Sequence, residues 1–171
     1  MPVTIGQYVS DYLPARKLPW PAAPKPVHIK AKPHLQKLSV KAVLWNVYGT
    51  LLVICGGELK HESDNDFIME AAFDKTLQEF KIWQSMSRKP GAPAAQLKEM
   101  YFKALTHLRM AGSGGERYPE VSSERIWEDI VKKLLQKDYQ IDVATYGAMN
   151  EFVIKIAYFF HASIQGYGAY P

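Results

Sequence analysis

One short apolar run sets the main constraint on the fold of this chain. Residues 40–47 read Val-Lys-Ala-Val-Leu-Trp-Asn-Val, and the turn formers Tyr48–Thr50 follow. Such a run predicts a strand buried on both faces, which Leu51–Ile54 could extend. A buried parallel strand needs neighbours that are reached through crossovers, and no later segment has this character. Either the strand pairs with a segment outside this sequence, so that the chain is cut short, or the run is not a sheet strand.

The sequence after Gly57 has the periodicity of helices. Side-chain oxygens that can cap a first turn stand at 63–66 and 122–124, and Gly- and Pro-rich segments separate the apolar stripes. We expect four helices: one that follows the caps at 63–66 and runs to about Trp83, one from about Ala94 to Met110, one that follows the caps at 122–124, and one from about Val143 to Ala162. Their expected buried stripes are Phe73, Leu77 and Phe80; Leu97, Tyr101, Leu105 and Leu108; Ile126, Trp127, Ile130 and Leu134; and Met149, Phe152, Val153, Ile156 and Phe160.

The N-terminal arm carries the excess positive charge. Residues 1–41 hold seven Lys or Arg against one acid, whereas residues 42–171 hold 14 basic and 16 acidic side chains. Seven of the eleven prolines also lie in this arm, which predicts extended backbone after a short helix over Ile5–Leu13. The charges are spread rather than clustered, so we expect an arm that drapes over the body with Trp20 as an anchor, and nucleic-acid binding by residues 1–41 is the weakest of the hypotheses.

The sequence has few features of a secreted, membrane or metal-binding protein. Its single cysteine, Cys55, cannot form an intramolecular disulfide and is expected to be a small buried hydrophobe. No apolar run reaches the roughly 18 residues of a membrane span, and no secretory signal begins the chain. His61, His107 and His161 lack the spacing of metal ligands, so we expect all three at the surface or an interface. These features predict a soluble, cytoplasmic protein.

Residues 41–52, Lys-Ala-Val-Leu-Trp-Asn-Val-Tyr-Gly-Thr-Leu-Leu, carry a family resemblance. They resemble motif I of the haloacid dehalogenase superfamily, in which an apolar strand ends in a nucleophilic aspartate and Gly-Thr-Leu follows shortly after. Tyr48 is similar to the 2-haloacid dehalogenase branch, because phosphatase branches usually place an acid–base aspartate there. The family inserts a helical cap after motif I, and residues 118–121, leading into 126–127, are similar to cap sequences. Residues 166–171 resemble the segment that returns to the core.

The resemblance implies an α/β fold with a Rossmann-like core, of which this mostly α chain holds one strand and a four-helix cap. Residues 1–38 are then a basic, proline-rich extension, and residues 39–56 are the first core strand with the motif I turn. Residues 57–163 form the cap-like domain, and residues 164–171 return toward a missing core. The family hydrolyses small anionic substrates, such as 2-haloacids or phosphate esters, through an aspartyl ester. We therefore expect a truncated or degenerate hydrolase of this kind.

The site that the resemblance implies consists of Asn46, Tyr48, Gly49 and Thr50. A side chain at the end of a buried parallel strand lies where α/β folds bind ligands, and Gly49 permits a sharp turn there. However, Asn46 stands where the family has its nucleophilic aspartate. A neutral amide has no anionic oxygen for the attack that forms the ester intermediate. We therefore expect this chain to be catalytically inactive.

The other elements of the family's chemistry have no match in the sequence. The hydroxyl of motif II, the lysine of motif III and the acids of motif IV are absent, and Lys75, Lys81 and Arg88 are only nearby candidates for the cap arginine. The wider family can use magnesium, but Asn46 removes a charge from such a site and Tyr48 supplies none. We therefore expect no cofactor, and a small anionic molecule as the ligand if the site is kept.

Two other interpretations stay open. The chain could be a noncatalytic helical module that forms a homo-oligomer or binds a partner chain completing the sheet, because a cap without its core exposes an apolar face. Alternatively, the run around Asn46 could be an ordinary strand followed by a glycine turn, with no chemical role.

Overall fold

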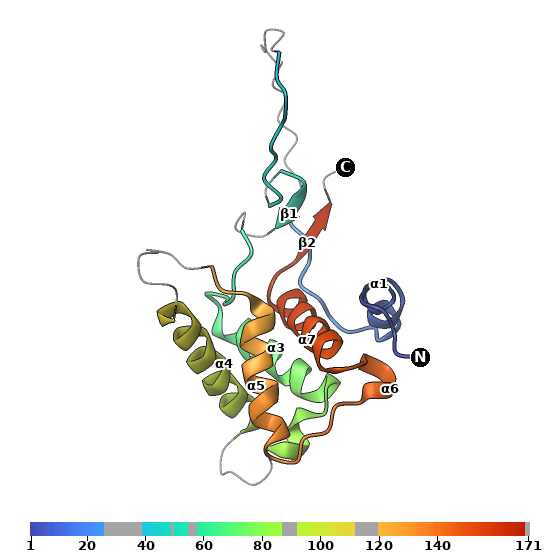
Figure 1. Cartoon of the computed structure of the whole chain (residues 1–171), viewed down its shortest axis with the longest axis vertical. Coiled ribbons are helices and arrows are strands. Elements are labelled where there is room, and N and C mark those ends of the chain that lie inside the picture. Colours follow the sequence, from blue (N-terminus) through green and yellow to red (C-terminus); the bar gives the residue numbers. More distant parts are fainter. Residues whose placement is uncertain (26–38, 49, 55–57, 87–91, 112–119, 170–171) are drawn as a thin grey trace.

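The computed structural model describes residues 1–25, 39–48, 50–54, 58–86, 92–111 and 120–169 (Figure 1). The predicted turn at Gly49 and the predicted burial of Cys55 lie outside these residues. The elements, in chain order, are α1 (Ile5–Gln7), the π-helical turn η1 (Tyr8–Tyr12), α2 (Leu13–Ala15), β1 (Leu52–Ile54), α3 (Asp66–Glu79), the 3₁₀ turn η3 (Ile82–Ser85), α4 (Pro93–Met110), α5 (Ser123–Leu135), α6 (Val143–Tyr146), α7 (Met149–Ile164) and β2 (Tyr167–Ala169). The prediction of a mostly helical chain is confirmed.

Four long helices form the body of the molecule. Helix α3 packs against α4 and α7, and α5 packs against the same two helices, so the four close into a ring (Figure 1). Each helix has an apolar stripe that it can bury only against neighbours, and the ring satisfies all four stripes within the chain. We call these helices, together with η3 and α6, the helical body.

Four aromatic side chains, one from each long helix, meet at the centre of this body. Phe73 of α3, Tyr101 of α4, Trp127 of α5 and Phe160 of α7 are all fully buried. The Phe160 ring lies 4.9, 4.7 and 5.2 Å from the centroids of the Phe73, Tyr101 and Trp127 rings. Aromatic contacts at these distances add to the stabilisation that burial of the rings provides. The predicted stripes thus form one shared core.

The helix boundaries differ from prediction at two places. Helix α3 ends at Glu79 instead of continuing to Trp83, because Lys81 adopts a left-handed conformation with φ of 54° and begins the 3₁₀ turn. The predicted helix from Val143 to Ala162 is interrupted at Gly147, whose φ of 83° and ψ of −168° suit only glycine. The buried Nζ of Lys155 donates a hydrogen bond of 2.6 Å to the Tyr146 carbonyl beside this break.

The N-terminal residues lie along the body as a strap, which we define as residues 1–25. Tyr8 is fully buried, and the Tyr12 and Tyr146 hydroxyls are 3.2 Å apart. The guanidinium of Arg16 lies 2.8 Å from the carboxylate of Glu79, whose side chain is only 2% exposed. Trp20 packs edge-on against Phe159 at 5.3 Å, as expected of an anchor. The predicted short helix is present, although it is π-helical at its centre.

The predicted buried strand over 43–47 is absent from the structure. These residues form no strand, and they lie in an extended segment that projects from the helical body near β1 (Figure 1). The side chains of Leu44 and Trp45 are 96% and 66% exposed. An isolated apolar run has no second sheet strand to cover its faces, so it stays in solvent. Among the described residues of 39–54, β1 is the segment that pairs in a sheet.

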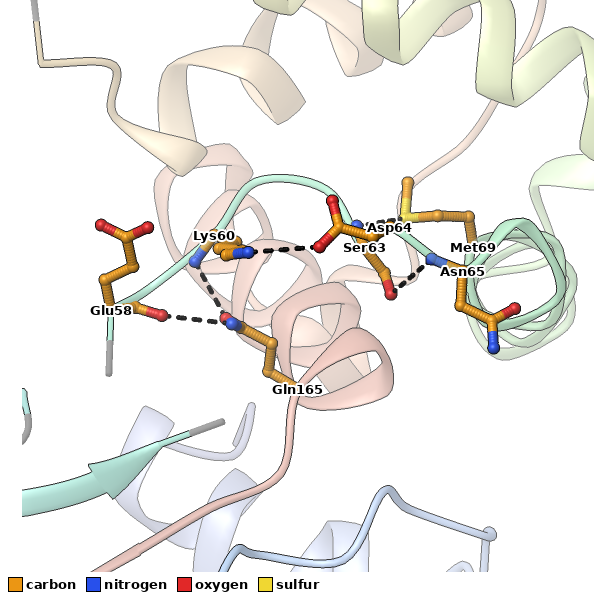
Figure 2. A network of polar contacts seen from close by, with 7 residues as sticks. All are labelled: Glu58, Lys60, Ser63, Asp64, Asn65, Met69 and Gln165. Atoms are coloured by element: carbon orange, nitrogen blue, oxygen red, sulfur yellow. Dashed lines mark hydrogen bonds and ion pairs between the residues drawn. The ribbon is translucent and has the colours of Figure 1, made fainter. Parts of the chain in front are cut away.

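A second strand that the sequence analysis missed pairs with β1. Strand β2 runs antiparallel to β1, with Val53 opposite Gly168 in the register. Just inside this pair, the side-chain amide of Gln165 accepts a hydrogen bond of 2.9 Å from the Lys60 backbone N–H and donates one of 3.1 Å to the Glu58 carbonyl (Figure 2). The chain therefore enters and leaves the helical body at one point. We call β1, residues 58–60 and residues 165–169 the stem.

Candidate functional site

Asn46, Tyr48 and Thr50, which the motif I resemblance assigns to a site, are all exposed, and Gly49 lies outside the described residues. Of these, Tyr48 also lines a pocket against the helical body. The backbone after Asn46 forms a turn, because the Val47 carbonyl accepts hydrogen bonds from the Leu51 and Leu52 amides at 3.0 and 2.9 Å. Asn46 and Tyr48 bring no carboxylate, so these positions do not fit a magnesium ion.

The basic residues considered as counterparts of the cap arginine lie elsewhere. Lys75 donates a hydrogen bond to the Pro19 carbonyl and lies 5.5 Å from the Trp20 ring, so it holds the N-terminal strap. Lys81 follows the end of α3 and lines a polar cavity beside Glu79. Arg88 lies outside the described residues. Neither lysine borders the pocket that contains Tyr48.

A pocket of about 300 Å³ lies where the stem, the start of α5, the α7 face and the N-terminal strap meet. Its wall is mainly apolar, and its polar side chains come from α5, α7 and two tyrosines. The described residues that line it are Ile5, Tyr48, Leu52, Ile54, Leu59, Ser123, Glu124, Ile154, Ala157, Tyr158 and His161. An apolar pocket with a few convergent polar groups is the usual form of a small-molecule site. We call it the stem pocket.

A serine–histidine pair forms the polar end of the stem pocket. The Oγ of Ser123 lies 2.5 Å from Nε2 of His161 and 3.4 Å from Nδ1 of His61. The two imidazole rings are 5.6 Å apart and nearly perpendicular. Ser123 is the first residue of α5 and His161 lies in the last turn of α7, so packing of these two helices brings the pair together. The contact of Ser123 with His61 links the body to the segment that follows residues 58–60 of the stem.

We expected His161 at the surface or at an interface. The structure instead buries it within the chain, and only 6% of the residue is exposed. Burial, with a smaller contribution from the neighbouring His61, lowers the pKa of His161 to about 4. Burial also lowers the pKa of His61, with Arg109 as the second cause. Both rings are therefore neutral near neutral pH.

Glu124 supplies the negative charge of the stem pocket. The Ser122 hydroxyl donates a hydrogen bond of 2.6 Å to its carboxylate. This bond lowers the pKa of Glu124 below its ordinary value, and a backbone hydrogen bond at the start of α5 adds to the effect. The carboxylate is therefore ionised at neutral pH, in the first helical turn where a negative charge is favoured.

The geometry of the Ser123–His161 pair suits binding better than nucleophilic catalysis. A general base works best when its pKa lies near the operating pH, and the imidazole of His161 is far below that. The Ser123 hydroxyl and Nε2 of His161 instead pair with each other in a mostly apolar setting. No local pattern marks this pair in the sequence, because its two residues are 38 positions apart and helix packing joins them.

The part of the chain that the structure describes contains no group of three or more His, Cys, Asp or Glu side chains arranged to hold a metal ion. Within the same residues, no helix has the length and apolarity needed to cross a membrane. Comparison with known proteins found no matching family model, no similar curated protein and no similar solved structure.

Proposed function

We propose that the helical body is the lid of a haloacid dehalogenase-like protein that has lost the nucleophile of its hydrolytic reaction. The observation that carries this proposal is the stem, in which β1 and β2 pair and Gln165 joins the two chain segments. A domain inserted into another fold must begin and end at neighbouring points. The body has this property, and the segment that resembles motif I leads directly into it.

Asn46 makes the proposed protein noncatalytic. The amide cannot supply the anionic oxygen that attacks carbon or phosphorus, so no covalent ester forms on this side chain. Substitution of Asn46 by aspartate restores that oxygen but not the lysine and hydroxyl of the later motifs, which have no match in this sequence. Ligand binding beneath the lid, without turnover, is the function that these residues support.

The test is release of chloride from 2-chloropropionate and of phosphate from p-nitrophenyl phosphate, by the native chain and by Asn46→Asp. We expect no release above background from either protein, at any protein concentration. Asn46→Ser serves as a matched control for the effect of substitution itself. Release that increases in proportion to the native protein would contradict the proposal, and release by Asn46→Asp alone would contradict the claim that further groups are missing.

A second candidate function is a noncatalytic interaction module, and a separate observation favours it. Residues 40–51, which we call the docking segment, carry large apolar side chains that are each at least 40% exposed. They are Val40, Val43, Leu44, Trp45, Val47, Tyr48 and Leu51. Contiguous exposed apolar surface commonly marks a protein–protein contact. Under this proposal the partner is a second copy of the chain, and association disappears when the docking segment is made polar.

A further inference from the structure

The stem pocket has a charge pattern that does not match the anionic substrates of the resembled family. Its ionised group is Glu124, and none of the described residues that line it is a lysine or arginine. Arg109, the cation acting on nearby His61, forms an ion pair of 3.3 Å with Glu62 and does not line the pocket. An anionic head group in this pocket would meet a carboxylate and no compensating cation.

The remaining polar groups of the stem pocket also disfavour an anionic ligand. His161 is neutral near neutral pH and is already paired with Ser123, so it offers no positive charge to an anion. Tyr48 and Tyr158 border the pocket, and the faces of tyrosine rings attract organic cations. The start of α5 carries a partial positive charge of about half a unit, which the full charge of Glu124 in its first turn exceeds.

The rest of the wall requires an apolar body on the same ligand. Leu52, Ile54 and Leu59 approach from the stem side, and Ile154 and Ala157 approach from α7. The volume of about 300 Å³ lies at the lower end of the range for small-molecule sites. A ligand with a short hydrocarbon chain and one charged end would fill it.

We propose that the stem pocket binds a small organic ammonium ion, with the hydrocarbon part against Leu52, Ile54 and Ile154 and the ammonium group toward Glu124. The inference goes beyond the proposed lid function and does not depend on it, because no step uses Asn46 or the motif I resemblance. Glu124 accepts the charged hydrogen bond, and the tyrosine rings border the cation. This assigns the pocket a ligand of the opposite charge to a haloacid or a phosphate ester.

Titration calorimetry at neutral pH with three probes of equal chain length tests the inference. Hexylamine is the cationic probe, 1-hexanol the neutral one and hexanoate the anionic one. We expect hexylamine to bind with a dissociation constant of roughly millimolar, as its few heavy atoms permit, and hexanol and hexanoate to bind more weakly. Equal or tighter binding of hexanol or hexanoate would overturn the assignment of the charge.

Two substitutions test whether hexylamine binds in the stem pocket. Glu124→Gln should weaken hexylamine binding about tenfold, because one charge-assisted hydrogen bond is lost. The affinity for hexanol should stay unchanged. The matched control is Glu128→Gln, which removes one negative charge from α5 at a position outside the pocket. This variant should bind hexylamine as tightly as the native chain does. Ile154→Trp, at a half-exposed wall position, should fill the pocket and abolish hexylamine binding while the circular dichroism spectrum stays native. Binding that survives Ile154→Trp, or that is unchanged by Glu124→Gln, would overturn the inference.

Discussion

The helical body and the docking segment are both rich in apolar residues, yet the structure buries one and exposes the other. In the body, each apolar stripe finds a complementary stripe on a neighbouring helix of the same chain, as Phe73, Tyr101, Trp127 and Phe160 do at the centre. In the docking segment, Leu44 and Trp45 are 96% and 66% exposed, and no strand of the described residues covers them. Apolar composition alone therefore does not decide burial, because a partner surface must also be present.

This difference has a functional consequence. The stripes of the body are covered within the chain, by the neighbouring helices and by strap residues such as Tyr8 and Leu13. A segment with unsatisfied apolar side chains is suited to a contact with another surface. The stem joins these two regions, and the stem pocket lies where they meet.

The largest effect should come from a matched pair of aromatic truncations. Phe160→Ala removes a fully buried ring from the centre of the body and should lower the free energy of unfolding by about 3–5 kcal/mol. Trp45→Ala removes a larger ring from the docking segment. This substitution should change the free energy of unfolding by less than about 0.5 kcal/mol. Urea denaturation followed by circular dichroism measures both. Similar losses for the two variants would show that the docking segment is part of the folded core.

The second effect is a dependence of the free energy of unfolding on pH, caused by His161 at the junction of the helical body and the stem. The pKa of His161 is about 4 in the folded protein and 6.5 in an ordinary environment, so the unfolded chain binds the proton more readily. Stability should therefore fall as the pH drops below about 6.5, and the full loss of about 3 kcal/mol should be reached below the folded pKa.

His161→Gln separates the contribution of His161 to the pH dependence of stability from that of the carboxylates. The glutamine cannot be protonated in this range, so the variant should lose less stability than the native chain between neutral and acidic pH. Urea denaturation at a series of pH values measures the difference. Parallel pH profiles for the two proteins would mean that His161 is not buried as a neutral ring.

A smaller effect should follow from removal of the ion pair that holds the N-terminal strap. Arg16→Ala leaves the buried Glu79 carboxylate without its cation, although Tyr146 still donates a hydrogen bond of 3.0 Å to it. Because the guanidinium is half-exposed and partly screened by water, we expect a loss of only about 1–2 kcal/mol. Lys98→Ala, which breaks an ion pair with the exposed Asp66, should cost about 0–0.5 kcal/mol. Equal costs would indicate that the strap is not latched through Glu79.

The helices of the body could be predicted from sequence because their signals are local. The stripes of Leu97, Tyr101 and Leu105 in α4, and of Ile126, Ile130 and Leu134 in α5, recur at helical spacing and are buried as expected. The break at Gly147 was missed, since a glycine within an apolar periodic run does not by itself reveal a left-handed backbone.

The stem and its pocket could not be predicted in the same way. A run such as Val43–Val47 has the composition of a buried strand, but its burial depends on neighbours that the composition does not specify. Strand β2 is three residues long and contains a glycine, so no alternation marks it. The contact between Ser123 and His161 depends on the packing of α5 against α7, which neither helix's own sequence encodes.

The most direct test of the difference between the two regions is the mass of the chain in solution, measured by light scattering across a concentration series. The native chain is compared with the double variant Leu44→Asp, Trp45→Asp, and the melting temperature of each is recorded. We expect the native chain to associate as its concentration rises, and the variant to stay monomeric with an unchanged melting temperature. A native chain that stays monomeric at every concentration, or a variant that melts earlier, would contradict a self-sufficient body carrying an exposed docking segment.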